Sequence, residues 1–175
     1  KNWLGSNQLS CLYGSSNTGK SFLALDMSWH IATGRAWNGN RLSQGVVLYL
    51  ATEGGNSFRN RVFALKEHYG DKNALLAVRP SPVDLFNTEV DLPTLTKLCD
   101  EIRDEKGEIA MIVVDTLSRA MAGANENTSE DMSQFIKNCD LLRNVSGAHL
   151  MIVHHSGKDT SRGALELHSQ QSRET

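Results

Sequence analysis

The stretch LSCLYGSSNTGKSFLALDMSWHIA, residues 9–32, decides the fold. Its centre, from Gly14 to Ser21, matches the pattern G-x-x-x-x-G-K-[ST]. A short apolar run precedes this pattern, as in a buried strand, and a helical pattern follows it. We therefore predict a strand, a glycine-containing loop and a helix in this order. The apolar face of the expected helix is formed by Phe22, Ala24, Leu25 and Trp29.

The residue types in this loop suit the binding of phosphate. Gly14 and Gly19 let the backbone turn so that successive N–H groups point at an anion, and the helix adds the partial positive charge of its N-terminus. Lys20 can reach the β- and γ-phosphates, and the Ser21 hydroxyl is a ligand for Mg²⁺. The alternative is an ordinary solvent-exposed loop in which Ser21 caps the helix. The predicted nucleotide-binding residues are Gly14, Ser15, Ser16, Asn17, Thr18, Gly19, Lys20, Ser21 and Phe22.

The composition is that of one globular domain. A chain of 175 residues is long enough to bury a hydrophobic core. Its hydrophobic fraction of 39% and charged fraction of 22% are ordinary for a soluble protein, and no apolar run approaches the ~18 residues that a membrane helix needs. No signal-peptide pattern follows Lys1. We therefore expect a cytoplasmic protein without a membrane partner.

The charge and the cysteines narrow the class of protein further. A net charge of −2 excludes a strongly basic nucleic-acid coat protein but leaves open a local basic surface. The three cysteines are an odd number without C-x-x-C spacing, which argues against a disulfide framework and against a zinc knuckle.

Apolar runs and helical patterns alternate along the whole chain. This alternation predicts a parallel, doubly wound α/β sheet with helices on both faces. Residues 116–130 are expected to form a long mobile loop. The expected strands are residues 9–13, 46–51, 74–78, 109–115 and 149–153, and the helical patterns lie within residues 21–32, 53–70, 94–107 and 129–145.

Two carboxylates follow apolar runs, at the edge of the sheet where ligands bind in such folds. Asp115 ends the fourth run and suits a carboxylate that holds the hydration shell of Mg²⁺ opposite Ser21. Its alternative role is a helix N-cap or a turn. Glu53 follows the second run and is placed to orient and deprotonate an attacking water. Its alternative role is a charge favoured by the dipole of a helix start.

Histidines and cations follow the last apolar run. His154 and His155 are neighbours on a strand end, so their side chains tend toward opposite faces; one can face a nucleotide, and the pair is a poor metal chelate. Lys158 and Arg162 lie in GKDTSRG, a cationic loop punctuated by glycines. Three roles stay open for this loop: a finger that reaches a neighbouring subunit's γ-phosphate, a contact to nucleic-acid phosphates, and a plain solvated loop.

Four segments together carry a resemblance to a known family. They are GSSNTGKSFLALDMSWHIATGRAWNG, VVLYLATEGG, MIVVDTLSRAMAGANENTSEDM and HLMIVHHSGKDTSRGA. The chain resembles the RecA-like P-loop ATPases of the plasmid RepA hexameric helicase type, which are common in plasmids and phages. The E-G-G after the second strand and the H-H-[ST]-G-K after the fifth strand are far more specific than the phosphate loop alone.

The resemblance implies a sheet in the order 3-2-4-5-1, with ATP bound at the subunit interfaces of a ring hexamer and single-stranded DNA in its channel. It implies that residues 14–21 bind phosphate and Mg²⁺, the latter partly through water and with Asp115. It also implies that Glu53 is the catalytic base and that His155 senses the γ-phosphate. The loops at about residues 118–129 and 156–163 would face DNA.

The end of the chain departs from this family. Relatives continue after S-R-G-A with a basic turn and further strands, whereas residues 165–175 here read LELHSQQSRET. We therefore expect a RecA-like ATPase domain at residues 1–164 and an atypical polar tail at residues 165–175, with the C-terminal strands of the fold missing.

These observations favour Mg²⁺-dependent ATP hydrolysis coupled to the binding or translocation of single-stranded DNA, as in a hexameric replicative helicase. Three alternatives remain: a recombination or repair ATPase of the RecA or RadA kind, a small-molecule kinase that uses the same phosphate loop, and a non-catalytic nucleotide-binding module.

Overall fold

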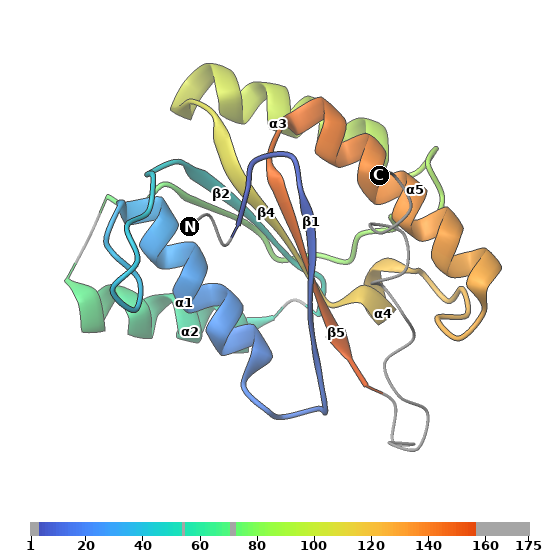
Figure 1. Cartoon of the computed structure of the whole chain (residues 1–175), viewed down its shortest axis with the longest axis horizontal. Helices are drawn as coiled ribbons and strands as arrows, with labels where there is room; N and C mark the ends of the chain where they lie inside the picture. The colour runs from blue at the N-terminus through green and yellow to red at the C-terminus, as the bar shows by residue number, and fades with distance from the viewer. Residues whose placement is uncertain (1–3, 54, 71–72, 157–175) are drawn as a thin grey trace, which may run out of the picture.

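A computed structural model describes residues 4–53, 55–70 and 73–156 (Figure 1). Strands and helices alternate along these residues, as the sequence predicts. The elements are β1 (Leu9–Gly14), α1 (Lys20–Thr33), β2 (Val46–Ala51), α2 (Asn56–Tyr69), β3 (Leu76–Arg79), α3 (Leu92–Lys106), β4 (Ile109–Asp115), α4 (Leu117–Ala120), α5 (Ser129–Ser146) and β5 (His149–His155).

The strands form one parallel sheet in the order β1-β5-β4-β2-β3. This order is 3-2-4-5-1 read from the other end, so the strand order implied by the resemblance is confirmed. The register pairs Ala51 with Asp115 and Gly14 with His155. The carboxyl ends of β2, β4, β5 and β1 therefore meet at one edge of the sheet, where the phosphate loop also begins.

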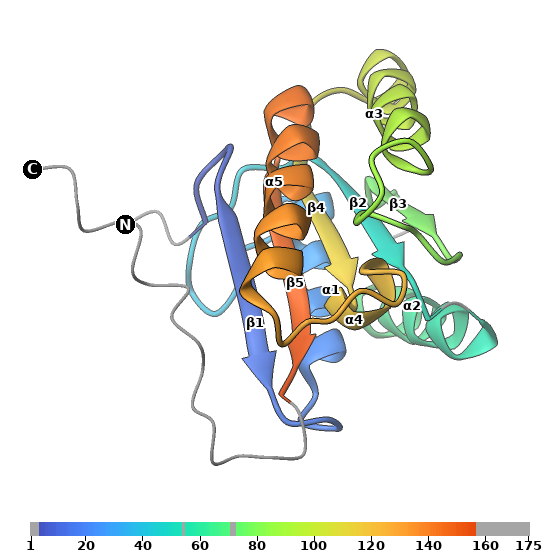
Figure 2. The ribbon, with the colours of Figure 1, turned by 90° about the vertical axis from the view of Figure 1, so that its right-hand side faces the viewer.

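Helices cover both faces of the sheet. Figures 1 and 2 show α1 and α2 on one face and α3 and α5 on the other. Every residue of β2 is buried, and β4 is buried apart from the half-buried Ala110, which explains why both strands are nearly continuous apolar runs. Alternate residues serve the two cores: Tyr49 and Val113 pack toward α1 and α2, whereas Leu50 and Val114 pack toward α3 and α5.

The structure corrects three predictions in detail. Strand β3 begins two residues later than expected, because Leu75 donates its N–H to the carbonyl of Ala32 at the end of α1. Residues 116–130 are not one long loop, since they contain α4, whose Leu117 is buried in the core. Phe22 is not part of the buried face of α1: it lies in the first turn, beyond the sheet, and is 60% exposed.

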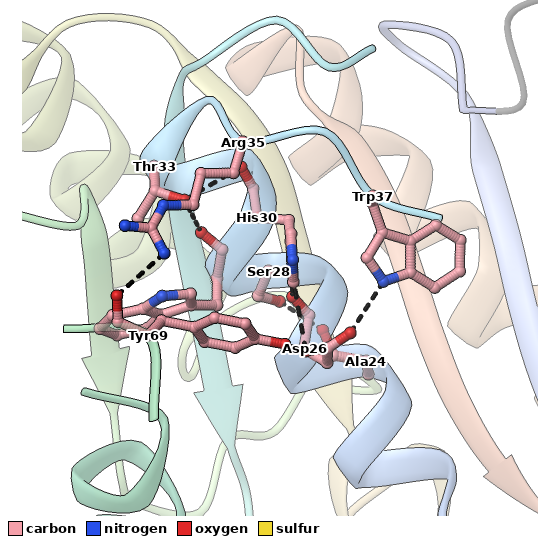
Figure 3. A network of polar contacts seen from close by, with 9 residues as sticks. Ala24, Asp26, Ser28, His30, Thr33, Arg35, Trp37 and Tyr69 are labelled. Carbon is pink, nitrogen blue, oxygen red and sulfur yellow. Dashed lines mark hydrogen bonds and ion pairs between the residues drawn. The ribbon is translucent and has the colours of Figure 1, made fainter. Parts of the chain in front are cut away.

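A polar network ties α1 to the end of α2 and to the segment between α1 and β2 (Figure 3). The Asp26 carboxylate accepts a hydrogen bond from Trp37 Nε1 at 2.8 Å and one from the Tyr69 hydroxyl at 2.6 Å. Arg35 donates to the carbonyl of Tyr69 at 2.9 Å, and its guanidinium lies over the Tyr69 ring. This network fixes α2 against α1, which is the helix that begins at the phosphate loop.

Within the described part of the chain, none of the helices combines the length and the apolar character needed to cross a lipid bilayer. The expected polar tail, residues 165–175, lies outside the described residues.

Candidate nucleotide-binding site

The phosphate loop joins β1 to α1 and curls around the side chain of Lys20. Lys20 is buried, and its ammonium donates to the carbonyl oxygens of Gly14 at 2.8 Å and Ser15 at 2.6 Å. The Thr18 hydroxyl also donates to Ser15 O, at 2.8 Å, and closes the loop from the other side. Burial lowers the pKa of Lys20, and the charge of Asp115 opposes that shift. The ammonium is thus held inside the loop, where phosphate oxygens would compete with backbone carbonyls for it.

The start of α1 offers free backbone donors. Gly19 lies in the left-handed region at φ 87°, a conformation that glycine adopts without strain. No side chain caps the helix, and the N–H groups of Lys20, Ser21 and Phe22 have no acceptor among the described residues. Such unsatisfied N–H groups, together with the helix dipole, favour an anion at this position. The side chains of the remaining predicted loop residues, Ser15, Ser16, Asn17 and Thr18, are exposed around it.

Asp115 connects the phosphate loop to the centre of the sheet. Its Oδ1 accepts a hydrogen bond from the Ser21 hydroxyl at 3.1 Å, and its Oδ2 accepts one from the Tyr49 hydroxyl at 2.7 Å. Thr52 fixes the backbone behind it, because its hydroxyl donates to Asp115 O and accepts from the N–H of Thr116, both at 2.8 Å. The carboxylate is therefore oriented from two sides while its oxygens stay beside Ser21.

The donors at Ser21 and Asp115 fit a magnesium ion. A hydroxyl and a carboxylate are hard oxygen ligands, which Mg²⁺ prefers, and it usually takes only one or two protein carboxylates together with water and phosphate oxygens. Residues 4–53, 55–70 and 73–156 contain no group of three or more His, Cys, Asp or Glu side chains arranged for a metal. Ser21 and Asp115 are the residues that would hold the ion here.

A small cleft of about 30 Å³ opens beside this pair. Glu53 is exposed at the cleft, two residues beyond the end of β2, so the predicted base and the predicted magnesium ligands share one space. The cleft is lined by Ser21, Ala51, Glu53, Ser57, Phe58, Arg61 and Asp115.

The two histidines at the end of β5 lie on opposite sides of the sheet. Alternation along β5 puts His155 on the face of Val153, which packs in the core of α1 and α2, and this is also the face of Asp115. The strand extends beyond the predicted end at Val153 because Gly14 pairs with His155. Ser156 N then donates to Gly14 O at 2.9 Å, which joins the end of β5 to the first residue of the phosphate loop.

His154 faces away from the nucleotide side and forms a small cluster of its own. Its Nδ1 lies 4.0 Å from a carboxylate oxygen of Glu126, and its ring lies 5.1 Å from that of Tyr13. Burial lowers the pKa of His154, while Glu126 opposes the shift and the charges of His155 and Lys20 add to it. The predicted cations Lys158 and Arg162 lie outside the described residues, as does Gly54 of the E-G-G motif.

Three further site residues escaped the sequence analysis: Tyr49, Thr52 and Arg61. Tyr49 carries the only polar side chain in the run VVLYLA, and a hydroxyl within a fully buried strand needs a partner, which is a signal that was available. Thr52 follows the same strand directly. Arg61 carried no such signal, since its position depends on how α2 packs beside α1.

The comparison with protein families agrees with this geometry. The AAA_25 family, described as an AAA domain, matches residues 1–161. The comparison with curated proteins gives no match. A five-stranded parallel sheet with a phosphate loop between β1 and α1 is the RecA-like P-loop core, and the match covers nearly all of the chain. The chain therefore belongs to the AAA_25 family of AAA domains, a family of P-loop ATPases.

Proposed function

We propose that this chain is the motor domain of a Mg²⁺-dependent ATPase that acts on single-stranded DNA in the manner of a hexameric replicative helicase. The observation that carries the ATPase part is the contact of Ser21 with Asp115, because it brings the phosphate loop, the magnesium ligands and Glu53 to one cleft. The family match supports an ATPase in general.

The reaction proposed is an attack of water on the γ-phosphorus of ATP, in line with the bond to the leaving ADP oxygen. Glu53 accepts the proton that the water loses as the new P–O bond forms. Lys20 and the free N–H groups of the loop stabilise negative charge on the phosphate oxygens, and they are already in place before the reaction. A magnesium ion held at Ser21 and Asp115 would supply further neutralisation of that charge.

His155 is proposed to report the state of the γ-phosphate to the segment that follows it. The support is geometric: His155 pairs with Gly14 in the register, and the next residue bonds to Gly14 O. A shift of the phosphate loop on loss of the γ-phosphate would therefore move the end of β5. The proposal of DNA binding and of a ring rests on the E-G-G and H-H-S-G-K motifs.

The test is steady-state ATP hydrolysis with and without single-stranded DNA, with the mass of the protein measured in the same buffer. Lys20→Ala is expected to lower turnover by about 100-fold or more. Glu53→Gln is expected to keep ATP binding and to lose turnover by about 100-fold to 10,000-fold. Lys97→Ala and Glu105→Gln are the matched controls, because both residues are exposed on α3 and far from the cleft.

Each part of the proposal can fail separately. Turnover that is unaffected by Lys20→Ala would remove the ATPase assignment to this site. Turnover that depends on Lys20 but is indifferent to DNA would leave an ATPase and remove the DNA-dependent motor. Nucleotide binding without turnover in the assembled protein would favour a non-catalytic nucleotide-binding module.

A further inference from the structure

Arg61 reaches the nucleotide cleft from α2. Ser57, Phe58 and Arg61 line the cleft together, since residues three and four apart lie on one face of a helix. Ser21 and Asp115 line the same cleft. Arg61 thus lies at the cleft that also holds the predicted magnesium ligands, where the terminal phosphate would lie.

Phe22 holds the guanidinium of Arg61 at the phosphate loop. The Arg61 Cζ lies 4.6 Å from the centre of the Phe22 ring, a distance typical of a cation above an aromatic face. Phe22 directly follows Ser21, so the ring is anchored to the loop itself. The large exposure of Phe22 is explained in the same way: its ring supports a cation at the site and does not fill the core.

The charge of Arg61 is not neutralised by an acidic side chain among the described residues. None of the ion pairs among the described residues involves Arg61, although Glu53 lines the same cleft. The positive charge of Arg61 nevertheless acts on Tyr49 behind the cleft: burial and Asp115 raise the pKa of Tyr49, and Arg61 opposes that rise. A half-buried guanidinium without a carboxylate partner beside the phosphate loop is suited to an anion that arrives with the substrate.

A guanidinium also has the right chemistry for a phosphate. Its planar fork of N–H donors matches two oxygens of a phosphate group and keeps its charge at any physiological pH. Asp115 and Glu53 both line the cleft, and Arg61 is the only cation among the described residues that line it. A triphosphate that enters the cleft would therefore meet the positive charge of Arg61 in addition to Lys20 and the Mg²⁺ ion.

We propose that Arg61 is a cation of the nucleotide site supplied by the same chain, and that its guanidinium, stacked on Phe22, contacts the terminal phosphate of ATP. This inference rests on the proposed function and deepens it, because it names the group that distinguishes ATP from ADP. Arg61 is thereby a residue of specificity for the triphosphate, additional to any cation from a neighbouring subunit.

The test compares the affinities for a fluorescent non-hydrolysable ATP analogue and for the matching fluorescent ADP analogue, both with Mg²⁺. Arg61→Gln is expected to lower the affinity for the triphosphate about tenfold or more and to leave that for the diphosphate within about twofold. Phe22→Leu, which removes the aromatic face but keeps an apolar side chain, is expected to cause a smaller loss in the same direction. Arg59→Gln is the control, because Arg59 lies on the same helix, is exposed and does not line the cleft.

Thermal unfolding of each variant shows that the fold is intact. If the wild type binds the triphosphate through Lys20 and Arg61→Gln leaves the ratio of the two affinities unchanged, the role of Arg61 is refuted while the nucleotide site stands. If the wild type binds neither nucleotide, or if Lys20→Ala binds both as well as the wild type, the proposed function and this inference fall together.

Discussion

Replacing Tyr49 by phenylalanine would remove a single oxygen atom from the interior behind the nucleotide cleft. Tyr49 is fully buried, and its hydroxyl donates to Asp115 Oδ2 at 2.7 Å. Phenylalanine keeps the ring and its contact with Phe58, whose centre lies 4.8 Å away, so no cavity arises. The change therefore removes the short hydrogen bond to the carboxylate, together with a long contact of the same hydroxyl with Ser21 O at 3.5 Å.

The expected loss is about 1.5–3 kcal/mol in the free energy of unfolding, the range for a hydrogen bond to a charged group. Denaturant unfolding at pH 7 measures it, because the midpoint falls while the slope is unchanged when only stability is affected. Tyr13→Phe is the matched control: Tyr13 is 44% exposed, and its hydroxyl has no hydrogen-bond partner among the described residues, so a change within about 0.5 kcal/mol is expected. Equal effects of the two substitutions would refute the claim that Tyr49 orients Asp115.

Two further predictions concern stability. Asp26→Ala removes the acceptor shared by Trp37 and Tyr69. Because Asp26 is about a third exposed, we expect the free energy of unfolding in urea to fall by about 1 kcal/mol. An unchanged free energy of unfolding would mean that the network does not hold α2 to α1. Burial lowers the pKa of His149 and His154, so the unfolded chain binds more protons below their ordinary pKa of 6.5. The free energy of unfolding should therefore fall as the pH is lowered from about 6.5 toward 5, and it should fall less for the His154→Gln variant. A free energy of unfolding that rises over this range would contradict the lowered pKa values of the two histidines.

Much of the fold was predictable from local patterns. Strands β2 and β4 were predicted with their observed bounds, because a parallel strand covered on both faces is an unbroken apolar run between turn residues. The predicted helical patterns within residues 53–70 and 94–107 end at Gly70 and Gly107. In the structure these glycines follow α2 and α3 directly, and both adopt positive φ angles. The order of the strands was not derivable in this way and came from the resemblance.

The parts that escaped prediction depend on contacts between distant residues. Phe22 fits the helical spacing of the buried face, yet its place in the first turn puts it beneath Arg61, which lies on another helix. The short helix α4 has only four residues, too few to show a helical spacing, and Leu117 is buried because it packs in the core beneath α3 and α5. The bond from Tyr49 to Asp115 joins residues that are 66 positions apart.

The position of β1 at the side of β5 has a consequence for how the protein is made. Among the described residues β1 pairs only with β5, and the bonds that join them span about 140 residues of sequence. Contacts of such long range form late, because the chain must close a large loop before they give any stabilisation. During synthesis, β1 and the phosphate loop that follows it therefore remain unpaired until residues 149–155 have left the ribosome. We expect a nascent chain that stops before β5 to bind no nucleotide, even though it already contains Gly14, Lys20 and Asp115.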